Sequence, residues 1–285
     1  MTTTALRWHT LSSHPGARIR VSAAALLSHK ACAALIEACT PALEGTARSE
    51  EYEHLVDYRS VPLHACGHRA AEIVAASGIS STAARATGVE AYAQEDIMVA
   101  RTRALQGDGT PCSILNLHHD RHNGKDGRKA TFMLNLATID PALHGGETYF
   151  PAANAPADDP FVAELDRLYA GGQRFLPRTS AAGLECEERL ECWRRDAALR
   201  EAHQHTGQPH CDGGPPLAPS GSAGAGVGAC AGVALLFDTS KSAGAWHAPC
   251  LVRTGPRGER PPDKVTLTWF KAAPPLWSAA LLHSM

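Results

Sequence analysis

The first part of the chain is dominated by apolar positions at helical spacing. A short alternating stretch at residues 17–21 predicts a strand, and the apolar residues that follow recur with the period of a helix. Ser28 precedes this run, so its hydroxyl can cap the helix, which is expected to end near Pro41. Further helical patterns cover residues 68–76 and 81–93. These patterns predict a mainly helical amino-terminal part.

Short apolar runs, interrupted by Gly, Asn and Pro, characterise the second kind of segment. Each run has the length and composition of a β-strand. The predicted strands lie at residues 97–103, 112–120 and 129–137, before Pro151, and at residues 232–237, 248–253 and 264–270. Several short strands separated by turn signals are typical of a β-sandwich or jelly roll.

The stretch at 155–230 differs from the strands on either side of it. One helical pattern follows Asp159, and a second covers residues 186–197. The sequence from Gly213 to Gly228 is rich in Gly, Ala, Ser and Pro, which predicts a flexible loop outside the core. We therefore predict one domain at 1–285, made of a helical part (17–96), a jelly-roll core (97–154 and 231–271) and this insertion.

Charge and composition exclude several classes of protein. The chain has 27 Lys and Arg against 29 Asp and Glu, a net charge of −2, and the charges are dispersed. It therefore lacks the basic surface typical of nucleic-acid or anionic-membrane binding. No apolar stretch reaches the roughly 18 residues of a spanning helix. The nine cysteines include no CxxC pair, which favours reduced thiols, and we expect a cytoplasmic protein.

The sequence His118-His119-Asp120 is the first candidate for chemistry. On a strand, His118 and Asp120 point to the same face, whereas His119 points to the other. A third ligand from a distant strand would complete two histidines and one carboxylate, the pattern of non-haem Fe(II) sites with open coordination positions. A second His-x-Asp, at residues 210–212, stands in the Gly/Pro-rich stretch without a strand to orient it, so we do not favour it.

The sequence around this motif resembles a known family. After His118 and Asp120 come, in order, Arg128-Lys129-Ala130-Thr131, GGETYFP at 145–151, GVALLF at 232–237, Trp246-His247-Ala248 and Lys264. This order resembles the prolyl 4-hydroxylase branch of the 2-oxoglutarate- and iron-dependent dioxygenases. The resemblance covers about residues 97–151 and 232–271.

The resemblance implies a fold, a metal site and a reaction. The fold would be mainly β with flanking helices, built on a double-stranded β-helix, or jelly-roll, core. His118, Asp120 and His247 would hold Fe(2+), with 2-oxoglutarate and O2 as co-substrates and ascorbate as a further cofactor. The reaction would hydroxylate a C–H bond, most simply C4 of a prolyl residue in a peptide or protein, and would release succinate and CO2. A free amino acid or small molecule stays open as the substrate.

The resemblance also implies a cation for the distal carboxylate of 2-oxoglutarate. Lys264 begins a strand that can aim it inward, but it follows His247 by 264 − 247 = 17 residues, more than is usual in the family. Arg257 has the usual spacing but lies in a Gly/Pro-rich turn. Either Thr131 or Thr148 could add a hydroxyl to the same carboxylate.

Other residues allow simpler or rival interpretations. Leu115 stands where family members often carry a Tyr that bonds the co-substrate. Cys250 lies near His247, but no third orienting group supports a thiol nucleophile. Trp246 and Trp269 are expected in the core. A rival function is a non-catalytic jelly-roll module that binds zinc, whose candidate ligands are His203, His205, His210 and Cys211.

Overall fold

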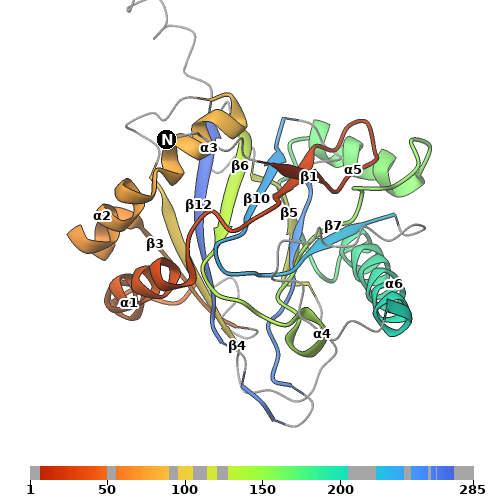
Figure 1. Ribbon diagram of the computed structural model, residues 1–285. Helices are drawn as coiled ribbons and strands as arrows, with labels where there is room; N and C mark the ends of the chain where they lie inside the picture. The colour runs from red at the N-terminus through yellow and green to blue at the C-terminus, as the bar shows by residue number, and fades with distance from the viewer. Residues whose placement is uncertain are drawn as a thin grey trace, which may run out of the picture.

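A large antiparallel sheet organises the fold. The computed structural model describes residues 7–49, 56–89, 96–104, 114–120, 128–204, 223–240, 245–255, 258–260 and 262–272. The seven-stranded sheet has the order β1-β2-β10-β6-β12-β4-β3 (Figure 1). Its strands are β1 (Trp8–Thr10), β2 (Ile19–Ser22), β3 (Val56–Pro62), β4 (Met98–Ala104), β6 (Arg128–Asn135), β10 (Ala234–Asp238) and β12 (Lys264–Ala272). Every neighbouring pair is antiparallel.

A smaller sheet faces the large one. It consists of β5 (Asn116–His118), β7 (Thr148–Phe150), β8 (Phe175–Pro177), β9 (Ala225–Val227) and β11 (Ala248–Pro249). β8 pairs with β5, and β7 lies between β11 and β9. Bridges from Ile114 to Cys250 and from His118 to His247 join the two groups. The rings of Phe150 and Phe237 pack between the two sheets, with centroids 5.1 Å apart. The two facing antiparallel sheets confirm the predicted jelly-roll core.

Helices cover the outer face of the large sheet. They are α1 (His29–Gly45), the 3₁₀ turn η2 (Leu63–Cys66), α2 (His68–Ser77) and α3 (Ile79–Thr87), grouped on one side in Figure 1. Ser28 caps α1 as predicted, with its hydroxyl accepting from the amide of Ala31. The predicted end near Pro41 is wrong, because α1 continues to Gly45. Pro41 lies on the exposed side, where water can satisfy the carbonyl that proline leaves open.

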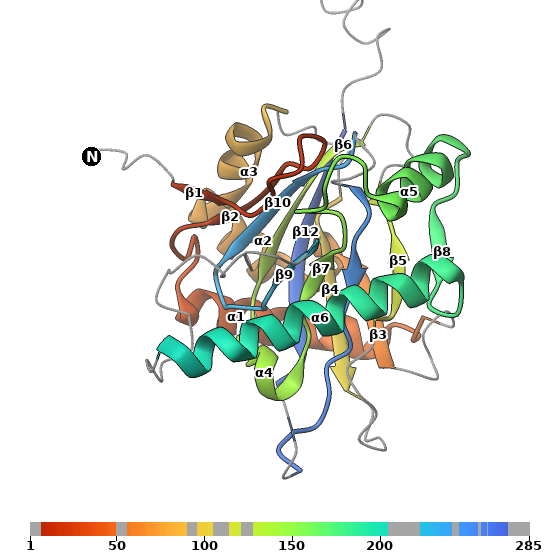
Figure 2. The same cartoon turned by 90° about the vertical axis from the view of Figure 1, so that its right-hand side faces the viewer.

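The predicted insertion contributes to the smaller sheet. It contains α5 (Pro160–Ala170), capped by the Asp159 side chain, and α6 (Ala181–Gln204); the short α4 (Pro141–His144) precedes it. Figure 2 shows α6 running across the strands β7 and β9. None of the helices among the described residues is both long and apolar enough to cross a membrane.

The prediction of a flexible loop from Gly213 to Gly228 is wrong over its last part. Ala225 and Val227 are buried in β9, which pairs with β7. A residue larger than glycine does not fit at position 226, because a Cβ there would lie 2.6 Å from the ring of Trp193 on α6. Small side chains that suggest a linker in the sequence therefore allow a helix to approach the sheet closely. Residues 213–222 lie outside the described residues.

Candidate metal centre

Two histidines that are distant in sequence face each other across neighbouring strands. His118 ends β5, and His247 directly precedes β11. The amide of His118 donates to the carbonyl of His247 at 3.0 Å, and the amide of His247 donates back to His118 at 2.9 Å. This backbone pair places the ring centroids 4.2 Å apart. The strand pairing itself therefore brings the two imidazoles together.

Asp120 completes a cluster of three donor groups. Its Oδ1 lies 3.8 Å from Nε2 of His118, and its Oδ2 lies 3.9 Å from Nε2 of His247. All three donor atoms lie within 4.8 Å of one another, and no other such group of three was found among the described residues. The structure thus brings together the three residues that the family resemblance implied as metal ligands.

Hydrogen bonds orient both imidazole rings for coordination. Nδ1 of His247 lies 2.8 Å from the carbonyl of Ala245, and Nδ1 of His118 lies 2.6 Å from Oδ1 of Asn116. Because these oxygens only accept, each Nδ1 carries the proton, and the lone pair of each Nε2 is directed toward Asp120. Burial lowers the pKa of His118 to about 3, aided by the neighbouring His247. A neutral ring is the form that binds metals.

The carboxylate of Asp120 is also held in place. The Thr131 hydroxyl donates to its Oδ2 at 2.7 Å, and Arg128 donates to its backbone carbonyl at 3.1 Å. Burial raises the pKa of the Asp120 carboxyl, but the combined effect of the two imidazoles, the hydroxyl and Arg128 outweighs it, so the pKa lies below its usual value. Two imidazoles oriented through their Nδ1 hydrogen bonds and a carboxylate with a lowered pKa fit a divalent first-row metal, and they match the facial triad of non-haem iron sites.

His119 lies outside this cluster, as strand alternation predicted. Its ring is buried between Tyr169 and Trp246, and its Nε2 lies 2.8 Å from the carbonyl of Gln173. Trp246 is fully buried and donates to the carbonyl of Leu165 on α5, which confirms the expectation that it belongs to the core. These contacts pack α5 against the back of the metal site.

Two residues next to the cluster escaped the sequence analysis. Asn116 orients His118, and the signal was present, because Asn116 is two residues before His118 and shares its face of the strand. The ring of Phe237 lies 4.7 Å from that of His247 and shields it. Nothing in the local sequence distinguishes Phe237 from an ordinary core residue.

Lys264 occupies the inner face of the large sheet. Its side chain is 7% exposed at the start of β12, where it pairs with Thr102. Burial lowers the pKa of Lys264, against the opposing effects of Cys250 and Glu147. Cys250 follows β11 and Glu147 precedes β7, so the ammonium group lies on the side of the large sheet that faces the smaller one. No hydrogen bond or ion pair to its amine is found within the described part of the chain. Arg257, the alternative cation, lies outside the described residues.

The two candidate threonines differ in position. Thr131 pairs with Phe270, far along β12 from Lys264, and its hydroxyl is bound to Asp120. The structure therefore shows a contact of Thr131 with a candidate metal ligand that the sequence did not predict. Thr148 is buried on β7. Contacts of either hydroxyl with 2-oxoglutarate stay predictions.

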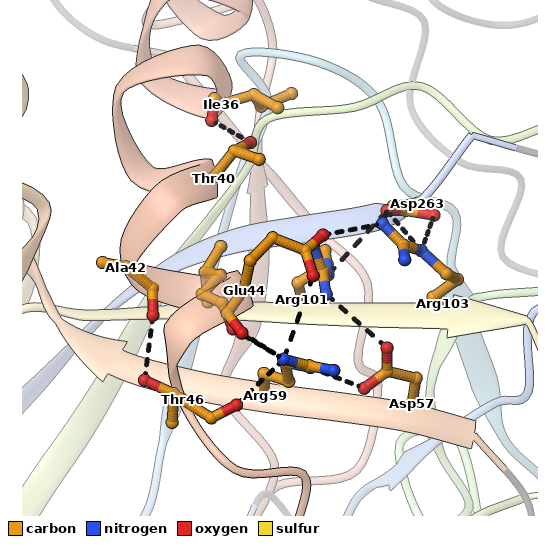
Figure 3. Close-up of polar contacts among 11 residues, drawn as sticks. Ile36, Thr40, Ala42, Glu44, Thr46, Asp57, Arg59, Arg101, Arg103 and Asp263 are labelled. Atoms are coloured by element: carbon orange, nitrogen blue, oxygen red, sulfur yellow. Dashed lines mark hydrogen bonds and ion pairs between the residues drawn. The ribbon is translucent and has the colours of Figure 1, made fainter.

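A network of charges fixes the start of β12 from outside the sheet (Figure 3). Arg103 donates to both oxygens of Asp263, the residue before Lys264, at 3.2 and 3.1 Å. The neighbouring Arg101 is 3% exposed and lies 2.6 Å from Glu44 on α1 and 3.8 Å from Asp263. Because Arg103 and the buried Arg101 hold this end of the strand, the backbone that carries Lys264 is well fixed.

Other candidates give no further site among the described residues. Cys250 is buried, and burial raises the pKa of its thiol well above the usual value, which does not suit a nucleophile. Leu115 is buried and Trp269 lies in the core, the latter as predicted. His205, His210 and Cys211 lie outside the described residues, and the side chain of His203 is not described.

Comparison with known proteins finds similar solved structures. A prolyl-4-hydroxylase from Pseudomonas putida is 13% identical, with a TM-score of 0.43 over 91% of this chain and 94% of that one. The alpha-ketoglutarate-dependent epimerase SnoN from nogalamycin biosynthesis is 11% identical, with a TM-score of 0.44 over 90% and 76%. HygX from Streptomyces hygroscopicus, with nickel and 2-oxoglutarate bound, is 13% identical, with a TM-score of 0.42 over 89% and 81%. No family model and no curated protein matches the chain.

The chain has a double-stranded β-helix fold. The assignment agrees with the two facing antiparallel sheets and with the bridges that join β5 to β11. The likeness to solved structures assigns neither a reaction nor a substrate to this chain. Within the fold, the His-x-Asp motif and the distant histidine meet between the sheets.

Proposed function

We propose that the protein is a 2-oxoglutarate- and Fe(II)-dependent dioxygenase. The observation that supports this most is the convergence of His118, Asp120 and His247, whose imidazole lone pairs and carboxylate face one point. The buried amine of Lys264 supplies a cation between the sheets for an anionic co-substrate.

Each residue has a distinct task in this proposal. The three clustered side chains hold the metal, and Thr131 and Asn116 fix the orientation of two of them. Lys264 binds the distal carboxylate of 2-oxoglutarate, since a buried carboxylate without a partner is costly. When bound, iron with 2-oxoglutarate and O2 supplies oxidising power for a C–H bond. One oxygen atom enters the substrate and the other enters succinate, with loss of CO2.

The substrate we propose is a prolyl residue in a peptide or protein, hydroxylated at C4, with ascorbate maintaining the ferrous state. This choice is supported by the order of the motifs from His118 to Lys264, which resembles the prolyl 4-hydroxylase branch. The alternative substrate is a free amino acid or another small molecule, and the experiment below distinguishes the two. Both substrate classes leave the assignment of the metal ligands unchanged.

An anaerobic titration tests the proposal first. Protein loaded with Fe(II) should develop a weak visible charge-transfer band when 2-oxoglutarate is added. In air, a proline-rich peptide should raise succinate production and gain one oxygen atom by mass spectrometry, whereas free proline should not. Hydroxylation of free proline or another small molecule, with no effect of the peptide, would overturn the choice of substrate.

Variants separate the ligands from ordinary histidines. His118→Ala and Asp120→Ala should abolish both the band and succinate production, while His64→Ala, which changes an exposed histidine, should leave both intact. Undiminished turnover in the two ligand variants would overturn the metal assignment. Purification with zinc, together with no succinate production at any iron concentration, would support the non-catalytic zinc-binding module instead.

A further inference from the structure

One arginine of α6 makes a two-pronged contact with a buried carboxylate. Arg194 donates from Nε to Oε1 of Glu147 at 3.1 Å and from Nη2 to Oε2 at 2.8 Å. Glu147 is 1% exposed, and the side chain of Arg194 is 16% exposed. Parallel charge-assisted bonds of this kind are among the strongest that a guanidinium group forms. Arg194 also donates to Glu191 on its own helix, at 3.2 Å.

Glu147 and Lys264 act on each other from facing sheets. Glu147 directly precedes β7 in the smaller sheet, and Lys264 begins β12 in the large one. The charge of Glu147 stabilises the ammonium form of Lys264, which burial disfavours. Yet both oxygens of Glu147 are bound to Arg194, and no ion pair joins Glu147 to Lys264 among the described residues.

The charges around Glu147 explain why Arg194 favours binding of an anionic ligand. Lys264, Glu147, Arg194 and Glu191, which Arg194 also binds, together carry +1 − 1 + 1 − 1 = 0. Without Arg194 the set carries −1, and the carboxylate of Glu147 loses the two hydrogen bonds that hold it. A further carboxylate would then be buried beside an uncompensated negative charge, which is unfavourable.

We propose that Arg194, through its bidentate contact with Glu147, is a positioning residue that keeps Lys264 available for the distal carboxylate of 2-oxoglutarate. The inference rests on the proposed function and extends it to the helix α6. It assigns Arg194 no contact with the co-substrate. The helix that crosses the smaller sheet thereby contributes a positive charge beside Glu147 as well as apolar packing.

Binding measurements on a metal-substituted protein test this directly. Protein loaded with Mn(II) is titrated with 2-oxoglutarate by calorimetry, without turnover. Arg194→Gln should weaken 2-oxoglutarate binding by about tenfold or more, because Glu147 then competes for Lys264. Binding of pyruvate, which has the same chelating end but no distal carboxylate, should change little. Arg189→Gln, which removes another paired arginine from α6, is the matched control and should bind both acids as the parent does.

A double variant distinguishes charge from structure. Glu147→Gln removes the competing carboxylate, so it should bind 2-oxoglutarate at least as tightly as the parent, and Glu147→Gln with Arg194→Gln should recover most of the lost affinity. A purely structural role predicts instead that the double variant is as weak as Arg194→Gln or weaker. That result, or unchanged affinity in Arg194→Gln, would overturn the inference.

Further controls distinguish a variant that does not fold, a failure of the inference and a failure of the proposed function. If Arg194→Gln does not fold, as judged by circular dichroism, Glu147→Gln and Arg194→Lys carry the test, since the first should retain 2-oxoglutarate affinity and the second should lose less than tenfold. Weaker binding in Glu147→Gln would then refute the inference.

If the parent protein takes up Mn(II) but binds neither 2-oxoglutarate nor pyruvate, the proposed function fails and the inference fails with it. Normal binding by the parent with no effect of Arg194 refutes the inference alone.

Discussion

Thr131→Val is expected to weaken metal binding without disturbing the fold. The exchange keeps the shape of the side chain and removes only the hydroxyl that donates to Asp120 Oδ2 at 2.7 Å. Both residues are buried, so water does not replace the lost donor. A hydrogen bond to a charged group contributes about 1.5–3 kcal/mol. Loss of a group that orients a metal ligand typically costs about 10–100-fold in metal affinity, or about 1.4–2.8 kcal/mol, in agreement with that range.

The assay is a titration of the metal-free protein with Mn(II), followed by electron paramagnetic resonance of the unbound ion. Thr148→Val is the matched control, because Thr148 is a buried strand threonine whose hydroxyl has no bond to a metal-ligand candidate among the described contacts. It should bind Mn(II) as the parent does. Equal or tighter binding by Thr131→Val would show that the hydroxyl stabilises the metal-free carboxylate rather than its coordinating orientation, which would refute the reasoning.

Two predictions concern the contacts of α6. Gly226→Ala should lower the free energy of unfolding by about 1–3 kcal/mol in urea titrations, because its Cβ would lie 2.6 Å from the Trp193 ring, whereas Gly45→Ala has free space and should be nearly neutral. Asp159→Asn should cost about 1–3 kcal/mol near pH 7, because Arg189 lowers the pKa of Asp159 by hydrogen bonding. The folded-state pKa is depressed, so this stabilisation is present above the unfolded pKa of about 3.9 and is lost as the pH falls below it. A difference that does not shrink as the pH is lowered below about 3.9 would contradict the assignment.

Local patterns were sufficient to locate the helices and one half of the candidate metal centre, but not the helix ends: α1 continues to Gly45, and the helix predicted at 81–93 is α3 (Ile79–Thr87), which ends at the left-handed Gly88. Helical spacing and the Ser28 cap predicted α1, and two-residue alternation placed His118 and Asp120 on one side with His119 on the other. These features depend on neighbours in the sequence, whose geometry the backbone fixes. His247 could be assigned only through the resemblance, because no local rule predicts which distant strand pairs with β5.

The structural features that the sequence did not predict share a physical cause: tertiary contacts override the local preference of the sequence. The helix α1 continues past Pro41 because its opposite face is buried against the sheet. The strand β9 forms from Gly and Ala residues because β7 offers unpaired backbone groups and Trp193 needs the space above Gly226. The bond from Arg194 to Glu147 joins the insertion to the GGET segment, and neither sequence indicates the other.

Variants of Asn116 offer a final test, because they change what orients the ring of His118 while His118 itself stays in the chain. Asn116→Ala removes the acceptor of the Nδ1 proton, so the ring can rotate or change tautomer, and we expect about 10–100-fold weaker Mn(II) binding. Asn116→Asp keeps an acceptor at the same place and should bind Mn(II) more tightly than Asn116→Ala does. Equal losses in both variants would mean that the amide donor of Asn116, and not the acceptor oxygen that meets His118, supports the site. Both variants keep the same strand backbone. A difference in Mn(II) binding between them therefore reports how much the orientation of the His118 ring contributes to metal binding.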